Sequence, residues 1–354
     1  MSRFFSSKYD ALTPYTPGEQ PKILNLTKLN TNECPFPPSQ RALDYGRAHT
    51  RPLNLYPEIA CTDLRKALAD LNGIGAENIL MGNGSDEILN FAFMAFCDER
   101  HPAAFPDISY GFYPVFAELN GVPYTEIPLR ADFRIAPEDY FDLGKTVFIA
   151  NPNAPTGLAL TMEQVRGILE RNRDSVVVID EAYVDFGGES CIPLIREFEN
   201  LLVVQTFSKS RSMAGARLGF AAGSEALIAD LNTIKFSTNP YNVNSMTLAL
   251  GLGVLLDEDT TRKNCRAIME NRAYTTEALQ KLGFSVLPSS ANFLLAKSDK
   301  IDGKALYLKL RERGVLIRHF DKDRIRDWNR ITVGTREQMD ILLDKVREIL
   351  EETP

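Results

Sequence analysis

Three polar residues of complementary chemistry stand directly after apolar runs in the middle of the sequence. The amide Asn151 follows TVFIA and the carboxylate Asp180 follows SVVVI. The amine Lys209 follows LLVVQTF, with only Ser208 between them. The intervals from 151 to 180 and from 180 to 209 are equal, and each suits one strand-helix-strand unit. Because ligands bind beyond the carboxyl ends of strands in an open α/β sheet, we expect the three side chains to converge on one crevice. Taken singly, each is also compatible with a helix cap, a turn or a surface charge.

A glycine-rich turn, LMGNGSDE at residues 80–87, is a candidate anion site. Two glycines permit a tight turn, and Ser85 is expected to cap the helix that follows. The backbone N–H groups of Gly84, Ser85 and Asp86 would then face outward at a helix N-terminus, where anions bind. An ordinary capped helix without a ligand would carry the same pattern.

The elements that position these residues alternate between short apolar runs and helical patterns from about 78 to 223, as is typical of α/β architecture. The apolar runs are continuous, which favours strands covered on both faces in a mainly parallel sheet. Thr161 and Gln164 form a capping-box start for a helix, and another helix is expected over 60–71. The strand candidates are 78–82, 146–150, 175–180, 201–207 and 218–223.

The pattern changes after about residue 246. Long helical patterns at 262–282 and 336–352 flank the strand candidates FSVLP, ANFLLAK, GVLIRHF and RITVG, which indicates a smaller α+β domain. We therefore predict an arm associated with the small domain or a dimer partner, a large ligand-binding domain, and a small C-terminal domain. Their predicted bounds are 1–40, 41–245 and 246–354.

The composition of the 354 residues excludes several classes of protein. A net charge of −7 argues against a nucleic-acid partner. Five scattered cysteines without CxxC spacing are typical of reduced cytosolic thiols, and three histidines without ligand spacing argue against a histidine-rich zinc site. No secretory signal is visible, and the most apolar stretch, 246–256, is too short to cross a bilayer. We expect a cytoplasmic protein that has no membrane contact.

An amide, a buried carboxylate, a phosphate-binding helix start, a lysine and an arginine are together the groups needed to hold pyridoxal 5′-phosphate. With these residues the sequence resembles the fold-type-I pyridoxal-phosphate-dependent aminotransferases, most closely the histidinol-phosphate aminotransferase branch. The resemblance implies an α/β fold with a mainly parallel sheet between helices and a smaller α+β domain. It covers nearly the whole chain and includes GNGSDE (82–87), SYGFY (109–113), NPNAPTG (151–157), VIDEAYVDF (178–186), TFSKSRSMAGARLGF (206–220) and RITVGT (330–335).

The resemblance also implies roles around the cofactor ring. Lys209 would form a Schiff base with the cofactor and then act as the general base of the reaction. Asp180 would keep the pyridine nitrogen protonated, and Tyr110 would stack on the ring. Asn151 and Tyr183 would hydrogen-bond the phenolic oxygen.

The implied cage of the cofactor phosphate consists of a helix start and polar side chains, namely Gly84, Ser85, Asp86, Thr206, Ser208 and Arg217. In this family a tyrosine at the position of Tyr56 reaches the phosphate from the other subunit. The resemblance therefore implies a homodimer with shared active sites.

On the substrate side, Arg330 and Arg318 match the arginines that hold the substrate anion. That anion is the phosphate of histidinol phosphate in one half-reaction and a carboxylate of glutamate or 2-oxoglutarate in the other, and a guanidinium fork fits both. Tyr15 and Asn32 match positions that close over the substrate, although a Pro-rich arm could equally serve dimer contacts alone. Glu19 departs from the family, which often has a lysine after the YxPG glycine.

Three other activities are compatible with parts of the pattern. A threonine-phosphate decarboxylase or an aromatic amino-acid aminotransferase would share the fold and the lysine. A non-catalytic binding module of the same fold would not need Lys209, Asp180 and Tyr183 together. A nucleotide-dependent dehydrogenase is excluded because no GxGxxG follows a strand.

Overall fold

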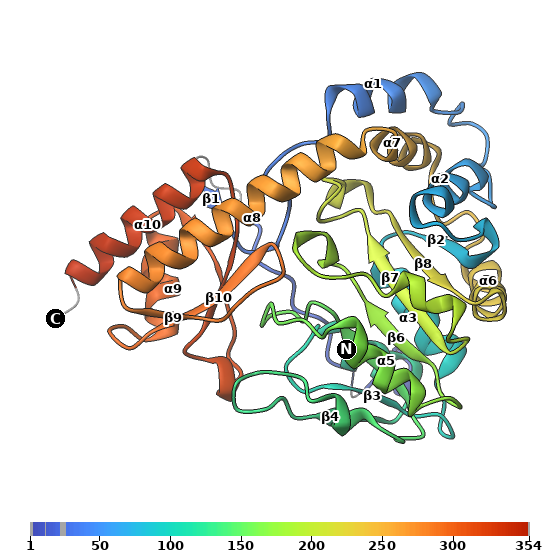
Figure 1. Ribbon diagram of the computed structural model, residues 1–354, viewed down its shortest axis with the longest axis horizontal. Coiled ribbons are helices and arrows are strands. Elements are labelled where there is room, and N and C mark those ends of the chain that lie inside the picture. The colour runs from blue at the N-terminus through green and yellow to red at the C-terminus, as the bar shows by residue number, and fades with distance from the viewer. Residues whose placement is uncertain (1–2, 11, 22–25, 353–354) are drawn as a thin grey trace.

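The computed structural model describes residues 3–10, 12–21 and 26–352, and its larger part is built on a seven-stranded sheet (Figure 1). The strand order is β2-β8-β7-β6-β5-β3-β4. Only β8 runs antiparallel to its neighbours, so the predicted mainly parallel sheet is confirmed. The strands are β2 (Ile79–Gly82), β3 (Ala103–Pro106), β4 (Tyr124–Ile127), β5 (Thr146–Ala150), β6 (Val177–Asp180), β7 (Leu201–Thr206) and β8 (Gly219–Gly223).

Helices cover both faces of this sheet, which is why its central strands read as continuous apolar runs. Successive residues of β6 enter different cores: Val178 packs with α3, α4 and α6, whereas Ile179 packs with α2, α5 and α7. The helices are α1 (Gln40–His49), α2 (Thr62–Asn72), α3 (Ser85–Phe96), α4 (Phe112–Asn120), α5 (Met162–Glu170), α6 (Glu225–Thr238) and α7 (Ser245–Leu255).

The start of α5 illustrates how local sequence sets an element. The Thr161 hydroxyl accepts from the Gln164 N–H at 3.2 Å, and the Gln164 side chain accepts from the Thr161 N–H at 2.9 Å. This reciprocal cap satisfies two N–H groups that the helix itself leaves unpaired, and it confirms the predicted capping box.

The smaller part is an α+β unit on the far side of α8 (Glu258–Lys281), the long helix that runs from one part to the other in Figure 1. Its antiparallel sheet has the order β12-β13-β10-β9. The core around the large sheet includes Val254 of α7, so packing with the larger part continues past residue 245. The elements are β9 (Phe284–Val286), β10 (Phe293–Ser298), α9 (Gly303–Glu312), β11 (Val315–Leu316), β12 (Arg318–His319), β13 (Asn329–Thr332) and α10 (Arg336–Glu351).

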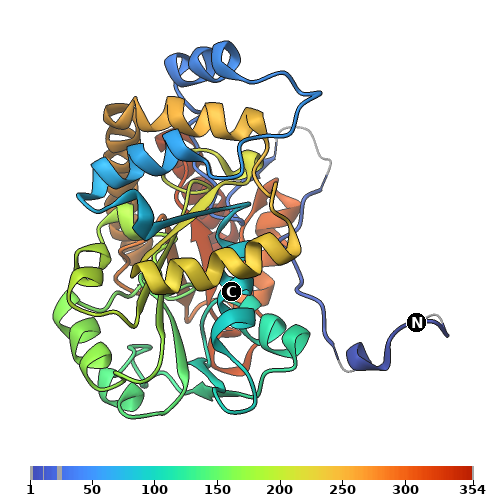
Figure 2. The ribbon, with the colours of Figure 1, turned by 90° about the vertical axis from the view of Figure 1, so that its right-hand side faces the viewer.

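The N-terminal segment joins the smaller part through a short parallel pair, β1 (Thr27–Lys28) with β11. Leu29 continues the contact by donating to the Leu316 carbonyl at 2.7 Å and accepting from the Thr332 N–H at 2.9 Å. Farther toward the N-terminus, the short helix η1 (Ser7–Tyr9) lies away from both parts, as Figure 2 shows. The other 3₁₀ turns are η2 (Ala76–Asn78), η3 (Pro137–Tyr140), η4 (Val184–Phe186), η5 (Ile192–Arg196), η6 (Ala214–Ala216) and η7 (Asp323–Ile325).

Among the helices of the described ranges, none has both the length and the apolar character required to cross a membrane.

Candidate active site

A cavity lies at the carboxyl ends of β5, β6 and β7, beside the first turn of α3. These strands are neighbours in the sheet, so residues that follow them in sequence meet in space. Nine of the residues predicted for the cofactor site lie on its wall. The lining consists of Ser85, Asp86, Tyr110, Ala150, Ala154, Asp180, Ala182, Tyr183, Thr206, Ser208, Lys209 and Arg217.

Asp180, the last residue of β6, is a buried carboxylate at this cavity. Its oxygens accept from the Tyr113 hydroxyl at 3.0 Å and the Ala182 N–H at 3.2 Å. Burial raises the pKa of Asp180 to about 6, and the Tyr113 hydrogen bond opposes that rise. No lysine or arginine of the described ranges forms an ion pair with it. A buried carboxylate without a cationic partner suits the protonated ring nitrogen of a pyridine.

Tyr113 was missed by the sequence reasoning, which took only Tyr110 from the SYGFY motif. Tyr113 is the second residue of α4, fully buried, with its hydroxyl on Asp180. Its ring packs edge-on against that of Tyr110 at 5.7 Å, a contact that depends on the turn between them and that no helical spacing could have indicated.

Lys209 extends from the end of β7 to the opposite side of the cavity. Its Nζ donates to the Thr31 carbonyl at 3.1 Å and lies 5.8 Å from the centre of the Tyr183 ring. Burial, followed by the nearby Arg330 charge, lowers the pKa of Lys209 to about 8. More of this amine is therefore neutral near pH 7 than of an ordinary lysine, as a nucleophile or base requires.

Two hydroxyl residues precede Lys209 on the cavity wall. Thr206 and Ser208 are both buried, and the Thr206 hydroxyl accepts from the Ser208 N–H at 3.1 Å. The bond holds the chain in a tight turn as it leaves β7, and Thr206, Ser208 and Lys209 all line the cavity.

The helix start at α3 differs from the prediction in one detail, because the cap is Gly84 and Ser85 is the first helical residue. Gly84 has φ +81°, a conformation that favours glycine, and its N–H bonds to the Gly82 carbonyl at 3.0 Å. The N–H groups of Ser85 and Asp86 lie in the first turn, where helices leave donors unpaired. At this turn the predicted anion site therefore has two free backbone N–H donors, those of Ser85 and Asp86, instead of three.

Arg217 closes the other side of this helix start. Its guanidinium donates to the Asp86 carboxylate at 3.1 Å and to the Ser208 hydroxyl at 3.4 Å. A Cβ atom on Gly84 would come within 2.6 Å of the guanidinium, so only glycine leaves room for it. The Asp86 side chain also accepts from the Tyr110 hydroxyl at 2.6 Å. The donors fit a phosphate, and the Asp86 carboxylate links them to the aromatic residue predicted to stack on the ring.

The structure does not bring the Asn151 amide to the cavity. Its oxygen accepts from the Leu160 N–H at 2.8 Å and its nitrogen donates to the Leu160 carbonyl at 3.3 Å. Because a buried amide must be hydrogen-bonded, Asn151 satisfies the backbone of the NPNAPTG loop, and Ala154 of that loop lines the cavity instead.

Arg318 and Arg330 lie directly opposite each other on β12 and β13. Side chains so paired emerge on the same face of the sheet. Arg330 donates to the Asn30 carbonyl at 3.0 Å and has a buried Nε without a partner, while Arg318 donates to the carbonyls of Thr16 and Pro17. Neither pairs with a carboxylate in the described parts of the chain. Two adjacent guanidinium groups without counter-charges form a candidate anion site.

Tyr15 and Asn32 reach this region in different ways. The Tyr15 ring stacks on Phe112 at 4.1 Å; burial raises its pKa, and the charges of Arg330 and Arg318 oppose the rise. Tyr15 therefore lies beside the anion site, as predicted for a residue that closes over the substrate. Asn32 is buried and donates to the Tyr183 hydroxyl at 3.0 Å, so its amide contacts the cofactor side of the cavity.

Tyr56 is the predicted site residue farthest from the cavity. Its side chain is 77% exposed and stacks on Tyr241 at 4.3 Å. It is not among the residues that line the cavity of its own chain.

Comparison with known proteins gives the same assignment as the cavity. The aminotransferase class I and II family matches residues 25–346. The chain belongs to this family. It is 45% identical to a histidinol-phosphate aminotransferase of Brachyspira hyodysenteriae and 47% identical to histidinol-phosphate aminotransferase 1 of Bradyrhizobium diazoefficiens, each over 99% of this chain and 100% of the relative.

A solved structure shares the fold. A histidinol-phosphate aminotransferase of Sinorhizobium meliloti in complex with pyridoxal 5′-phosphate superposes with a TM-score of 0.85 at 22% identity, over 92% of this chain and 91% of that one. This chain is a pyridoxal-phosphate-dependent aminotransferase of fold type I. The buried carboxylate of Asp180, the lowered pKa of Lys209 and the helix start after Gly84 fit that cofactor.

Proposed function

We propose that this aminotransferase transfers an amino group between L-histidinol phosphate and 2-oxoglutarate, as a step of histidine synthesis. The observation that carries the substrate assignment is the cross-strand pair Arg318 and Arg330, whose side chains share one face of the sheet and have no carboxylate partners among the described residues. The full-length similarity to histidinol-phosphate aminotransferases supports the same substrate.

The side chains around the cavity would hold the cofactor at three points. When bound, pyridoxal 5′-phosphate supplies an aldehyde that reacts with amines and a ring that withdraws electrons from the amine-bearing carbon. Asp180 would keep a proton on the ring nitrogen, and Tyr110 would cover one ring face. The first turn of α3 and the Arg217 guanidinium would bind the phosphate.

Lys209 would move the proton on which the reaction depends. Its Nζ has a pKa of about 8, so it can take a proton from the amine-bearing carbon of the substrate near neutral pH and return it on the cofactor side. The Thr31 carbonyl, 3.1 Å from Nζ, gives the free amine a fixed acceptor and so a fixed orientation.

The arginine pair would bind the anionic end of either substrate. A phosphate of histidinol phosphate and a carboxylate of 2-oxoglutarate both present oxygen pairs that a guanidinium fork matches. Arg330 lies between the Phe293 and Phe320 rings, 5.4 and 5.6 Å from their centres, where reduced contact with water strengthens ionic bonds.

The proposal is tested by the visible spectrum of the purified protein with histidinol phosphate and, in a parallel cuvette, with phenylalanine. Loss of the band of lysine-linked cofactor with histidinol phosphate, and its return with 2-oxoglutarate, is expected. If only phenylalanine removes the band, the enzyme is an aromatic amino-acid aminotransferase. Release of carbon dioxide from threonine phosphate would identify the decarboxylase alternative.

We also propose that the enzyme is a homodimer in which Tyr56 enters the active site of the other subunit. Tyr56 lies outside its own cavity, within an exposed apolar surface that a second copy would cover. The most exposed apolar side chains near it in sequence or packed with it are Leu53 at 69%, Leu55 at 62% and Tyr241 at 39%.

Mixed dimers test this arrangement directly. Lys209→Ala and Tyr56→Ala homodimers should both have low activity. A mixed dimer contains one site with an intact Lys209 and, if Tyr56 acts across the interface, an intact Tyr56 from the partner. Refolding the two variants together should therefore restore a substantial fraction of activity. No recovery in dimers that have verifiably exchanged subunits would mean that Tyr56 acts within its own chain or not at all.

A further inference from the structure

We propose that Asn32 is a positioning residue for Tyr183: it donates a hydrogen bond to the tyrosine hydroxyl and leaves the hydroxyl proton for the oxygen of a bound cofactor. The family resemblance of the sequence suggested that Asn32 closes over the substrate. The inference rests on the pyridoxal phosphate chemistry of the enzyme and does not depend on which amine is the substrate.

The orientation of the Asn32 amide follows from Thr332. The Thr332 hydroxyl accepts from the backbone N–H of Asn32 at 3.0 Å and donates to the Asn32 side-chain oxygen at 3.0 Å. With the oxygen held there, the amide presents its NH₂ group to the Tyr183 hydroxyl, 3.0 Å away. Because an amide nitrogen can only donate, the Tyr183 oxygen is the acceptor in this bond.

The hydroxyl proton of Tyr183 is thereby left for a ligand. In the described residues no acceptor takes that proton, although Tyr183 is buried and lies on the cavity wall. Its ring packs edge-on against Phe293 at 5.0 Å and 89°, which fixes the position of the hydroxyl. An oxyanion in the cavity is the natural partner for a held donor of this kind.

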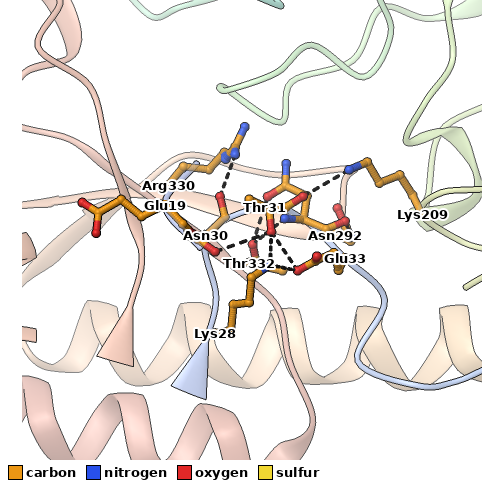
Figure 3. A network of polar contacts seen from close by, with 10 residues as sticks. Glu19, Lys28, Asn30, Thr31, Glu33, Lys209, Asn292, Arg330 and Thr332 are labelled. Atoms are coloured by element: carbon orange, nitrogen blue, oxygen red, sulfur yellow. Dashed lines mark hydrogen bonds and ion pairs between the residues drawn. The ribbon is translucent and has the colours of Figure 1, made fainter. Parts of the chain in front are cut away.

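The backbone explains why an asparagine stands at this position. Asn32 has φ +56°, in the left-handed region where asparagine is favoured among residues with a side chain. The turn places three successive carbonyls on active-site groups: Asn30 accepts from Arg330 at 3.0 Å, Thr31 from Lys209 at 3.1 Å, and Asn32 from the Asn292 amide at 2.9 Å (Figure 3).

Figure 3 also shows Lys28, Thr31 and Glu33 joined beneath this turn by an ion pair and hydrogen bonds. The turn is thus held from both sides, by these bonds and by Thr332. A residue fixed in this way can orient its neighbour with little freedom lost during the reaction.

Among the variants at position 32, only Asn32→Asp changes the charges around Tyr183, because it adds a carboxylate. Burial raises the pKa of Tyr183, while the Arg330 charge and the Asn32 hydrogen bond oppose the rise. The other ionisable groups that face it are Asp180, Asp86, Lys209, Tyr15 and Tyr113. The part of the Asn32→Asp shift that depends on the Tyr183 hydroxyl therefore reports the Asn32 contact.

The test replaces Asn32 by aspartate, which has nearly the same shape but accepts where the amide NH₂ donates. In Asn32→Asp the Tyr183 proton turns toward residue 32, and the phenolic oxygen of the cofactor loses a donor. The midpoint of the pH titration of the visible spectrum of the holoenzyme should rise by about 1. Asn32→Gly, which suits the left-handed backbone, should shift the midpoint in the same direction.

Two controls separate orientation of Tyr183 from support of the turn. Thr332→Val removes the hydroxyl that orients the Asn32 amide but leaves the bond to Tyr183 possible, so its spectral midpoint should rise by less than that of Asn32→Asp. In a Tyr183→Phe background, Asn32→Asp should cause a clearly smaller shift, due to the added carboxylate charge alone. An equal shift in Thr332→Val, or an undiminished shift without the Tyr183 hydroxyl, would overturn the proposal. A raised KM for the amine in Asn32→Asp, with an unchanged spectrum, would also overturn it. That result would mean that Asn32 contacts the substrate.

Discussion

The two ends of the active site are built in different ways. The cofactor end is formed where β5, β6 and β7 finish and α3 begins, all within one sheet. The proposed substrate end is formed by β12, β13 and the N-terminal segment, with Asn30 and Arg330 in contact across 300 positions. The cofactor end follows from a series of strand-helix-strand units, whereas the substrate end forms only when the N-terminal segment packs against the C-terminal part of the chain.

This difference separates the residues proposed for the chemical step from those proposed to select the substrate. The cofactor end lies where buried strands finish, whereas the arginines proposed to bind the substrate anion lie on β12 and β13. Substitutions at the cofactor end should therefore lower turnover, and substitutions at the substrate end should change KM. The predictions below run from the largest expected effect to the smallest.

Lys209→Ala should lower turnover by roughly 10³-fold or more, because both the covalent link and the proton-transferring base are lost. The protein should still bind the cofactor through the helix start and Asp180. Equilibrium dialysis and steady-state rates measure the two effects. Lys235→Ala is the control, since Lys235 is also a buried lysine bonded to a carbonyl, that of Ile59, outside the cavity. Near-normal turnover in Lys209→Ala would show that Lys209 is not the catalytic lysine.

Arg330→Ala should raise KM for histidinol phosphate and for glutamate alike, by roughly 10²-fold, because charge-assisted bonds to the shared anion site are lost. Turnover at saturation should fall less. Arg324→Ala serves as the control, since Arg324 belongs to the same part of the chain but pairs with Asp107. An increase for only one of the two substrates would show that their anions bind at different sites.

Tyr113→Phe should lower turnover roughly tenfold and move the acid limb of its pH profile upward by about 1. The sign follows from Asp180, whose pKa is raised to about 6 by burial and held down by the Tyr113 hydroxyl. Without that donor the carboxylate takes a proton at higher pH. The control is Tyr140→Phe, a buried tyrosine whose hydroxyl has no partner. An unmoved acid limb would contradict the role given to Tyr113.

Proton linkage gives a related expectation for the cofactor-free protein. The pKa of Lys209 is lowered from its ordinary value to about 8, so the unfolded chain binds the proton more tightly than the folded one. Its contribution to the free energy of unfolding should increase as pH rises from about 8 to about 10. Comparing urea unfolding of wild type and Lys209→Met across this range measures it. Parallel curves for the two proteins would exclude the effect.

Glu19→Gln should have the smallest effect, a rise in KM of about twofold at most. The Glu19 carboxylate contacts Tyr307 and lies 3.0 Å from the Arg311 Nε, so it fastens the N-terminal segment to α9. Half-exposed pairs of this kind contribute little to stability. Glu352→Gln, which removes an exposed pair with Arg313, is the matched control. A large loss of activity would mean that Glu19 contacts substrate after all.

The sequence by itself predicted five of the seven strands of the large sheet and most of the cofactor end, but it missed β3 and β4. Asp180, Ser208 and Lys209 each follow a buried apolar run, and in a parallel sheet that position already implies a shared edge. The same reasoning misplaced Asn151, because the pattern cannot tell an amide that faces a ligand from one that satisfies a nearby loop. It also took Ser85 for the cap, since the positive φ that selects Gly84 is a feature of the folded turn.

Only the tertiary structure decided what the remaining residues contact. Tyr113 reaches Asp180 across 67 positions, and Asn32 reaches Tyr183 across 151. Hydrogen bonds between such distant residues depend on the relative placement of α4, β6 and the N-terminal segment, which side-chain packing fixes and local periodicity does not encode. The sequence therefore determined which chemistry the protein carries, and the packed fold determined which residues orient the groups that perform it.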